Sequence, residues 1–263
     1  MIKVLLTGAS GTVGKEVLLQ LSEFSDEIEI TVFDKEFTGS GNFYKKSGRN
    51  FNLVFGNISE KIDLCKVCAD KDVIIHLAAI IPPLADKFPR LAEDVNITGT
   101  RNLIECTEEF SPKAFFIYSS SISVYGDRLV NPWIKTKDKL IASDRDEYAR
   151  TKIEAEKIII NSKLNWTIFR LTAIMGTNNH KPSPLMFHMP LDTPLEIATP
   201  KDTGRAFVKA LKHLDVLNKN IYNLGGGEKC RITYSDFLSR SFEIFGLGSL
   251  SFQKNAFPRK NFH

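Results

Sequence analysis

The sequence predicts an α/β protein with a doubly wound parallel sheet. Along its 263 residues, short apolar runs alternate with amphipathic stretches, which is the pattern of successive strand and helix units. Most of the runs are apolar on both faces, as strands are when helices cover both sides of a sheet. Parallel neighbours need crossover connections, and the amphipathic stretches supply them.

We expect seven strands, at residues 3–6, 28–33, 53–55, 73–77, 114–118, 166–170 and 221–224. Helices lie between them, and two show an apolar stripe at helical spacing. The first is 12–24, with Val13, Val17, Leu21 and Phe24 on one face. The second is 202–217, with Ala206, Ala210, Leu214 and Leu217.

Two segments break this alternation. Residues 174–200 contain five prolines, too many for a regular helix or an inner strand. Residues 234–245 form an expected helix, after which the chain reaches His263 with no closing element. We therefore expect a main domain at 1–173 plus 201–224. We also expect a small substrate lobe at 174–200 plus 225–263, which would be incomplete.

The composition limits the classes of binding partner and the cellular compartment that we expect. Lys and Arg total 35 against 31 Asp and Glu, a net charge of +4, with no basic block of the kind that binds nucleic acid or anionic lipid. The longest apolar run, 73–83, is about half of what spans a bilayer. No hydrophobic leader precedes the first strand, and four cysteines make no disulfide framework at this size. We expect a cytoplasmic protein with no nucleic-acid or membrane partner.

The first strand leads into the turn Thr7-Gly8-Ala9-Ser10-Gly11-Thr12-Val13-Gly14, and a helix follows at once. Gly8 permits a tight exit from the strand, Gly11 lets the backbone approach a pyrophosphate, and Gly14 lets the helix pack closely. The helix N-terminus then attracts the phosphates. The alternative is a glycine-rich turn without a ligand. We assign Gly8, Ser10, Gly11, Thr12, Val13 and Gly14 to cofactor binding.

An acid at the end of the second strand supports this assignment. Asp34 lies 20 residues after Gly14. A carboxylate at this place accepts hydrogen bonds from the adenosine ribose and repels a 2′-phosphate, which favours NAD over NADP. The adjacent Lys35 weakens the discrimination without reversing it.

A hydroxyl-rich segment and a Tyr–Lys pair indicate the chemistry. Ser119, Ser120 and Ser121 follow the fifth strand, so their hydroxyls emerge at the carboxyl edge of the sheet, where open α/β folds bind ligands. Tyr148 and Lys152 lie four residues apart and share one helical face. An ammonium near a phenol lowers the phenol pKa, so Tyr148 could take a proton from an alcohol while hydride leaves. Such a pair is also common by chance on a surface helix.

Together these motifs resemble the extended branch of the short-chain dehydrogenase/reductase superfamily, specifically its NAD-dependent epimerase/dehydratase family. The resemblance covers about residues 1–230. It also includes His76-Leu77-Ala78-Ala79, Asn96-x-x-Gly99-Thr100, the run from Ser119 to Gly126 and Asn223-Leu224-Gly225-Gly226-Gly227. It implies a Rossmann-type domain, a small-molecule substrate such as a nucleotide sugar, and a homodimer formed by helices around 94–109 and 146–161.

The resemblance also implies roles for individual residues. Ser121, Tyr148 and Lys152 would be the catalytic residues, with Ser121 holding the substrate oxygen. Asn96 would support the active-site helix. The further cofactor contacts would be Asn57, Ile58, Leu77, Ala78, Ala79, Asn96, Ser119, Tyr148, Lys152 and Leu171. We expect the helix at 146–161 to expose Ile153, Ile158, Ile159 and Ile160, which is more apolar surface than one contact with the sheet needs and favours the dimer.

Departures from the family pattern concern the substrate. Ile122 and Ser123 stand where dehydratases carry an Asp-Glu pair, which argues against that chemistry. Ala173 stands where many nucleotide-sugar epimerases have an Asn that contacts the diphosphate, and 195–199 lacks a further Arg. Three functions stay open: a sugar or nucleotide-sugar epimerase, a dehydrogenase or reductase of another alcohol, and a non-catalytic dinucleotide sensor.

Weaker signals have simpler explanations. Cys65-x-x-Cys68 has no second pair, so we expect buried thiols beside Ile62 and Ala69 on one helical face, and no metal site. His180 and His188 are either substrate contacts or ordinary loop residues. We expect His76 to be a packed, hydrogen-bonded residue, and Tyr125 either lines the pocket or packs beneath it.

Overall fold

A parallel seven-stranded sheet forms the centre of the computed structural model, which describes residues 1–47, 50–128, 133–176 and 191–248. The strand order is β3-β2-β1-β4-β5-β6-β9. The strands are β1 (Ile2–Thr7), β2 (Ile28–Asp34), β3 (Phe51–Phe55), β4 (Val73–His76), β5 (Phe115–Ser121), β6 (Asn165–Leu171) and β9 (Asn220–Leu224). This confirms the predicted fold class, and each expected strand overlaps an observed one.

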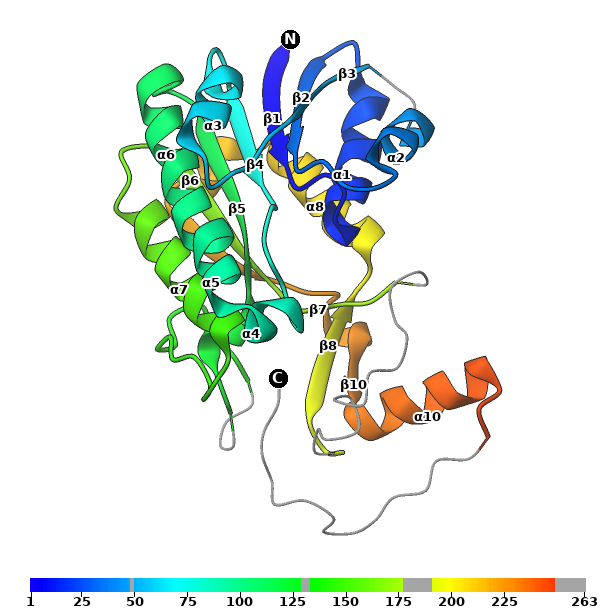
Figure 1. Cartoon of the computed structure of the whole chain (residues 1–263). Coiled ribbons are helices and arrows are strands. Elements are labelled where there is room, and N and C mark those ends of the chain that lie inside the picture. The colour runs from blue at the N-terminus through cyan, green and yellow to red at the C-terminus, as the bar shows by residue number, and fades with distance from the viewer. Residues whose placement is uncertain (48–49, 129–132, 177–190, 249–263) are drawn as a thin grey trace.

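Helices cover both faces of the sheet (Figure 1). On one face lie α1 (Thr12–Leu21) and α8 (Pro200–Ala210), which pack against each other. The other face carries α3 (Lys61–Cys68), α6 (Gly99–Phe110) and α7 (Glu147–Ile160). Each layer closes its own apolar core against the strands. The sheet is therefore doubly wound, with a crossover helix on each side.

Shorter elements complete this domain. They are η1 (Ser22–Phe24), α2 (Ser40–Ser47), α4 (Leu84–Lys87), α5 (Pro89–Ala92), η2 (Glu93–Thr98), η3 (Ile122–Tyr125) and α9 (Leu214–Leu217). The expected helix at 202–217 is wrong as a single element. It divides into α8 and α9 because His213 leaves the helical conformation, with φ −136° and ψ 25°.

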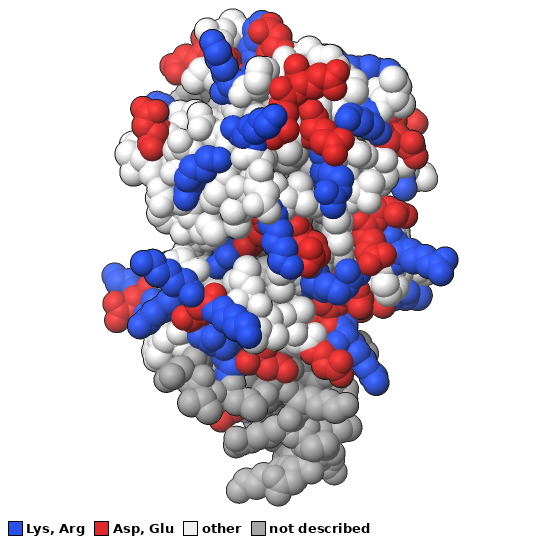
Figure 2. Space-filling view, turned by 90° about the vertical axis from the view of Figure 1, so that its left-hand side faces the viewer, with Lys and Arg blue, Asp and Glu red and all other residues white. Residues whose placement is uncertain are grey.

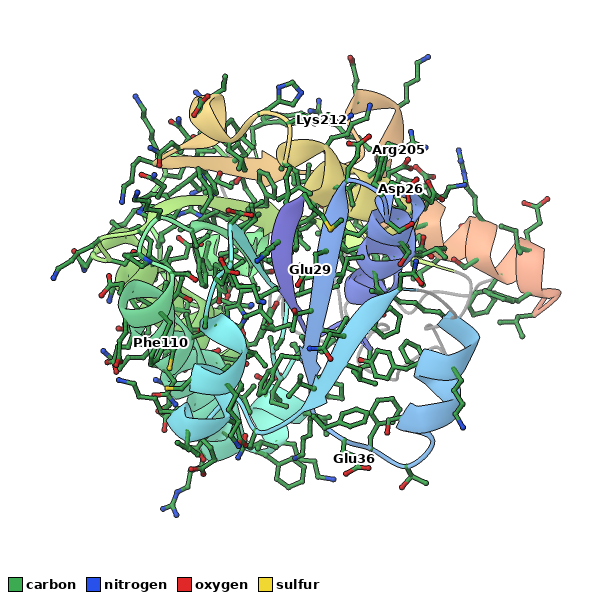
Figure 3. All side chains as sticks on the ribbon, turned by 90° about the horizontal axis from the view of Figure 1, so that it is seen from above. Asp26, Glu29, Glu36, Phe110, Arg205 and Lys212 are labelled. Carbon is green, nitrogen blue, oxygen red and sulfur yellow. The ribbon has the colours of Figure 1, made fainter. Side chains whose placement is uncertain are left out.

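Side chains from both helical layers fill the space around the strands when the molecule is viewed from above (Figure 3). Figure 2 shows acidic and basic side chains interspersed over the face that carries α6 and α7. Ile159, expected to be exposed on α7, is fully buried because it packs in the core beneath the helix. Ile160 is exposed. Among the described helices, none is long and apolar enough to cross a membrane.

A second, smaller sheet lies beyond the carboxyl edge of the first (Figure 1). It comprises β7 (Ala173–Ile174), β8 (Pro194–Ala198) and β10 (Arg231–Thr233), in the order β10-β8-β7. The helix α10 (Tyr234–Phe245) follows β10 after the short η5 (Glu228–Cys230). The expectation of no inner strand in 174–200 is wrong, since β8 is the middle strand. Its proline is the first residue, where a missing N–H costs least.

Candidate functional site

The carboxyl edge of the main sheet gathers the residues that the sequence singled out. The glycine turn follows β1, Asp34 ends β2, Asn57 and Ile58 follow β3, and Leu77 to Ala79 follow β4. Ser119 and Ser121 lie at the end of β5, and Leu171 ends β6. Because all these strands are parallel neighbours, the residues form one continuous row from β3 to β6.

The glycine turn is too tight for side chains at two positions. Gly8 has φ +75°, and a Cβ placed there would lie 2.5 Å from the backbone N of Ala78. A Cβ on Gly14 would lie 2.0 Å from the carbonyl oxygen of Gly8. The cap residue of α1 is Gly11, which has no side chain to satisfy the N–H groups of the first helical turn. The turn therefore fits the pyrophosphate of a dinucleotide.

Asp34 is held by three donors at the end of β2. Its Oδ2 accepts hydrogen bonds from the backbone N–H of Ser10 at 2.8 Å and from the hydroxyl of Tyr44 at 2.6 Å. Its Oδ1 accepts from the backbone N–H of Lys35 at 2.8 Å. Tyr44 is buried on α2, and burial together with the Asp34 carboxylate raises its pKa. Sequence reasoning missed Tyr44, because nothing in the pattern of α2 points to Asp34.

The remaining expected cofactor contacts differ in exposure. Asn57 is exposed, and its Oδ1 accepts a hydrogen bond from the N–H of Ser59 at 3.2 Å. Ile58 is buried against Gly99. Leu77, Ala78 and Ala79 are half-buried, as expected of residues that could line a ligand.

The structure brings Ser121, Tyr148 and Lys152 to one place. The Nζ of Lys152 donates to the carbonyl oxygen of Ser119 at 2.7 Å and lies 5.7 Å from the centre of the Tyr148 ring. The Oγ of Ser121 accepts hydrogen bonds from the backbone N–H of Ser123 at 3.2 Å and from its hydroxyl at 3.0 Å. The Ser121 hydroxyl proton is thus left to donate, and Tyr148 lies close enough to receive it.

Burial sets the protonation of this pair. It raises the pKa of Tyr148 above its ordinary value, and the hydrogen bond from Ser121 offsets only part of the rise. Burial also lowers the pKa of Lys152 to about 7. In the chain alone the pKa of Tyr148 is raised on balance, because the loss of solvation outweighs the hydrogen bond from Ser121.

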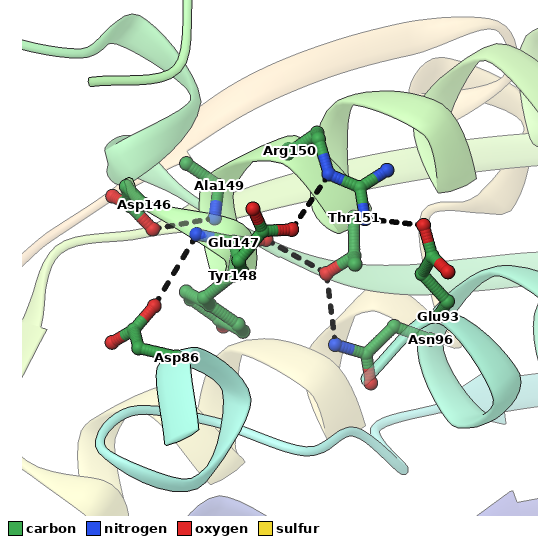
Figure 4. A network of polar contacts seen from close by, with 9 residues as sticks. All are labelled: Asp86, Glu93, Asn96, Asp146, Glu147, Tyr148, Ala149, Arg150 and Thr151. Atoms are coloured by element: carbon green, nitrogen blue, oxygen red, sulfur yellow. Dashed lines mark hydrogen bonds and ion pairs between the residues drawn. The ribbon is translucent and has the colours of Figure 1, made fainter. Parts of the chain in front are cut away.

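The start of α7, which carries Tyr148, is anchored from two sides (Figure 4). Asp146 caps the helix, and its Oδ1 accepts from the N–H of Ala149 at 2.8 Å. Asp86 on α4 accepts from the N–H of Glu147 at 3.2 Å. Two of the helix's first N–H groups thereby find acceptors, and Tyr148 is fixed between them.

Asn96 ties α7 to the segment that follows β4, and Figure 4 shows its bond to Thr151 on α7. Its Oδ1 accepts from the N–H of Ile80 at 2.7 Å, and its Nδ2 donates to the Ile80 carbonyl and to the Thr151 hydroxyl, both at 2.9 Å. An ion pair between Arg150 and Glu93 at 2.6 Å joins α7 to η2, the element that also carries Asn96. Thr151 precedes Lys152, so these contacts fix the backbone beside the amine.

His76 lies fully buried between two hydroxyls. Its Nδ1 is 2.7 Å from the Thr7 hydroxyl, and its Nε2 is 2.9 Å from the Thr100 hydroxyl. Burial lowers its pKa to about 3, so the ring is neutral at pH 7. Tyr125 is also buried, and its hydroxyl donates to Asn223 at 2.7 Å. Both residues pack and bond beneath the site.

The cysteine pair on α3 has no metal-binding arrangement. Cys68 is buried and Cys65 is half-buried, with its sulfur 3.1 Å from that of Cys106. Ile62, expected beside them, is 69% exposed and so lies on another face of the helix. No cluster that could hold a metal occurs within the part of the chain that the structure describes. His180 and His188 lie outside those residues.

A cavity of about 280 Å³ opens beside Ser121 and Tyr148, between the end of the main sheet and β8. Its wall includes Ile122, Ser123, Ala173 and Leu195, all at the places where the sequence departs from the family pattern. Three charged side chains also reach the wall: Arg128, Asp146 and Glu196. Burial raises the pKa of the Asp146 carboxyl.

The chain is similar to known proteins in sequence and in structure. A model of the 3-beta hydroxysteroid dehydrogenase/isomerase family matches residues 5–178. D-erythronate dehydrogenase of Haemophilus influenzae is 29% identical over 132 residues, which are 49% of this chain and 40% of that protein. Human 3 beta-hydroxysteroid dehydrogenase type 7 is 27% identical over 123 residues, 46% of this chain and 33% of that protein. The chain thus matches less than half the length of either relative.

Among solved structures, the UDP-glucuronic acid 4-epimerase of Bacillus cereus, in complex with UDP-glucuronic acid and NAD, shares the fold. Its TM-score is 0.79 at 22% identity, and the match covers 94% of this chain and 84% of that one. The family match spans more than half of the chain and agrees with the extended short-chain dehydrogenase/reductase resemblance. The chain therefore belongs to the 3-beta hydroxysteroid dehydrogenase/isomerase family.

Proposed function

We propose that the chain is an NAD-dependent dehydrogenase or reductase that acts at a secondary alcohol or ketone carbon. The observation that carries the proposal is the meeting of Ser121, Tyr148 and Lys152 at one place, where Ser121 and Tyr148 line a cavity. The glycine turn and Asp34 lie along the same sheet edge and support NAD as the cofactor. The family and both sequence relatives bear dehydrogenase names, which supports net oxidation or reduction.

The cavity wall favours an alcohol other than a nucleotide sugar. Ala173 and Leu195 offer no charge where a diphosphate would need donors. On the described wall, the one cation is Arg128, which already pairs with Asp138. Glu196 on the same wall would repel a diphosphate, although Arg231 offsets part of its charge through an ion pair at 3.0 Å.

In the proposed reaction NAD, when bound, takes or returns the hydride. Ser121 donates a hydrogen bond to the substrate oxygen and orients it. Oxidation requires the Tyr148 phenolate, whose oxygen receives the alcohol proton; in reduction the Tyr148 phenol returns that proton to the substrate oxygen. Lys152 binds the nicotinamide ribose and stabilises the Tyr148 phenolate by its charge.

A substrate panel tests this proposal. Purified protein is incubated with NAD and, separately, with D-erythronate and related hydroxy acids, 3 beta-hydroxysteroids and UDP-sugars. We expect NADH in proportion to the alcohol consumed. An epimer formed without net NADH would instead establish nucleotide-sugar epimerisation, the second candidate, which the shared fold with the Bacillus cereus enzyme favours. NAD binding without turnover of any substrate would indicate a dinucleotide sensor.

Three further properties are proposals of the same kind. We infer a cytoplasmic homodimer that pairs α6 and α7 with their symmetry mates. We also propose the division into a cofactor domain at 1–173 plus 201–224 and a substrate lobe from the remaining residues. The small sheet of β7, β8 and β10 beside the cavity supports that division.

A further inference from the structure

A buried carboxylate lies one helical turn beyond Lys152 and has no part in the reaction outlined above. The Glu156 side chain is 1% exposed. Its Oε1 accepts hydrogen bonds from the Ser120 hydroxyl at 2.5 Å and from Nε of Arg170 at 3.0 Å. Its Oε2 accepts from Nη2 of Arg170 at 2.7 Å. The carboxylate is therefore fixed by a two-pronged ion pair and a hydroxyl.

This ion pair is the centre of a hydrogen-bond network that joins five elements beneath the site, namely α7, β5, β6, β9 and η3. Ser120 on β5 and Asn223 on β9 flank Arg170 on β6 in register. The Nη1 of Arg170 donates to the Tyr125 hydroxyl at 2.6 Å, and that hydroxyl donates to Asn223. Ser120 and Arg170 hold the Glu156 carboxylate from two different strands. The carboxylate therefore stays on the face of α7 that carries Lys152.

Lys152 faces few groups that could balance its charge. Its Nζ lies 4.6 Å from the centre of the Tyr118 ring, and burial keeps this tyrosine protonated by raising its pKa. His76 on β4 is neutral, because burial lowers its pKa to about 3. Tyr148 is protonated as well. Arg170 on β6 carries charge of the same sign as Lys152.

Glu156 is thus the anion among the described groups around Lys152. Residues four apart on a helix are neighbours, with Cβ atoms about 5–6 Å apart. Burial lowers the pKa of Lys152 to about 7, and the Glu156 carboxylate opposes this fall. Loss of the Glu156 charge would therefore lower the pKa of Lys152 further.

We propose that Glu156 is a positioning residue whose carboxylate supplies the counter-charge that keeps the Lys152 ammonium protonated beside Tyr148. Arg170 holds this carboxylate in place through its two hydrogen bonds. The inference rests on the proposed function, in which protonated Lys152 binds the ribose and stabilises the phenolate.

The test follows the Lys152 amine directly by NMR. Protein labelled with ¹³C at lysine Cε is titrated with acid and base, and the Lys152 signal is assigned by its loss in Lys152→Met. Glu156→Gln keeps the shape of the side chain but removes its charge. In Glu156→Gln we expect the titration midpoint of the Lys152 amine to fall by about one pH unit relative to the wild type. Glu156→Asp keeps the charge and should recover most of that change.

The matched control is Glu154→Gln on the same helix. Glu154 is 41% exposed and pairs with Lys157, so its loss should leave the Lys152 midpoint unchanged. If circular dichroism shows that Glu156→Gln does not fold, Glu156→Gln/Arg170→Met takes its place, because removing both charges avoids a lone buried ion. Its reference is Arg170→Met, which keeps the Glu156 charge, and the double variant should titrate below that reference.

The inference would be overturned if the Lys152 midpoint did not fall in whichever Glu156→Gln variant folds, compared with its reference. An equal change in Glu154→Gln would overturn it as well. The titration needs neither substrate nor NAD. If the midpoint falls but no alcohol is turned over, the proposed function fails while the link between Glu156 and Lys152 stands. If alcohols are turned over and the midpoint does not move, Glu156 has only a structural role.

Discussion

Asp34 should decide which dinucleotide the protein binds. A carboxylate and a 2′-phosphate charge about 4 Å apart repel each other by about 4 kcal/mol at an effective dielectric constant near 20. Even half of that, about 2 kcal/mol, corresponds to a roughly 30-fold ratio of dissociation constants. We therefore expect NAD to bind at least about 30-fold more tightly than NADP. In Asp34→Ala the ratio should fall to within about threefold.

The same substitution should also reduce stability, because Asp34 accepts the hydrogen bond of the buried Tyr44 hydroxyl. A buried donor left without an acceptor costs about 1–3 kcal/mol. For a chain of this size each kcal/mol lowers the melting temperature by about 2–4 °C. Asp34→Asn keeps an acceptor for Tyr44 but removes the charge, so it should lose the cofactor preference with less loss of stability.

Titration calorimetry with both dinucleotides and thermal unfolding monitored by circular dichroism measure the two effects. Asp34→Ala/Tyr44→Phe provides the control, since it removes the orphaned hydroxyl and should regain part of the lost stability. Equal affinities of the wild-type protein for NAD and NADP would refute the reasoning. An Asp34→Asn variant that retains the full preference would refute it as well.

Three more predictions concern the turn, the amine and the oligomer. Gly14→Ala should abolish NAD binding, because the added Cβ would lie 2.0 Å from the Gly8 carbonyl oxygen. Calorimetry measures the affinity, and a Kd within threefold of wild type would contradict this prediction. Lys152→Met should weaken NAD binding and slow turnover together, and a loss confined to turnover would exclude a ribose contact. Sedimentation velocity at micromolar concentration should show a dimer that Ile160→Asp dissociates and the control Ile62→Asp on α3 does not; a monomeric wild type would rule the dimer out.

The strands of the main sheet could be predicted because a strand buried on both faces is a continuous apolar run, whatever it pairs with. The glycine turn was equally visible, since its spacing is local. The middle strand β8 was not, because only its place beside β7 and β10 makes it regular. The proline at its start, Pro194, argued against an inner strand.

Contacts between distant segments explain what sequence reasoning missed at the site. Tyr44 reaches Asp34 from a different element, and Glu156 meets an arginine 14 residues away on β6. The four-residue spacing from Lys152 to Glu156 was visible, but nothing in it revealed that the carboxylate is buried. The direction of the Tyr148 pKa likewise depends on burial, which the charges in the sequence do not specify.

Transfer of the proton by the Tyr148 phenol, while hydride moves to or from the cofactor, is tested most directly by Tyr148→Phe. Turnover and NAD affinity of this variant are measured with the alcohol that the substrate panel identifies. Loss of a general acid–base group slows a reaction by about 10²–10⁴-fold. We predict a decrease of that size in kcat with the Kd for NAD within about twofold of wild type. Turnover of Tyr148→Phe near the wild-type rate would contradict the account.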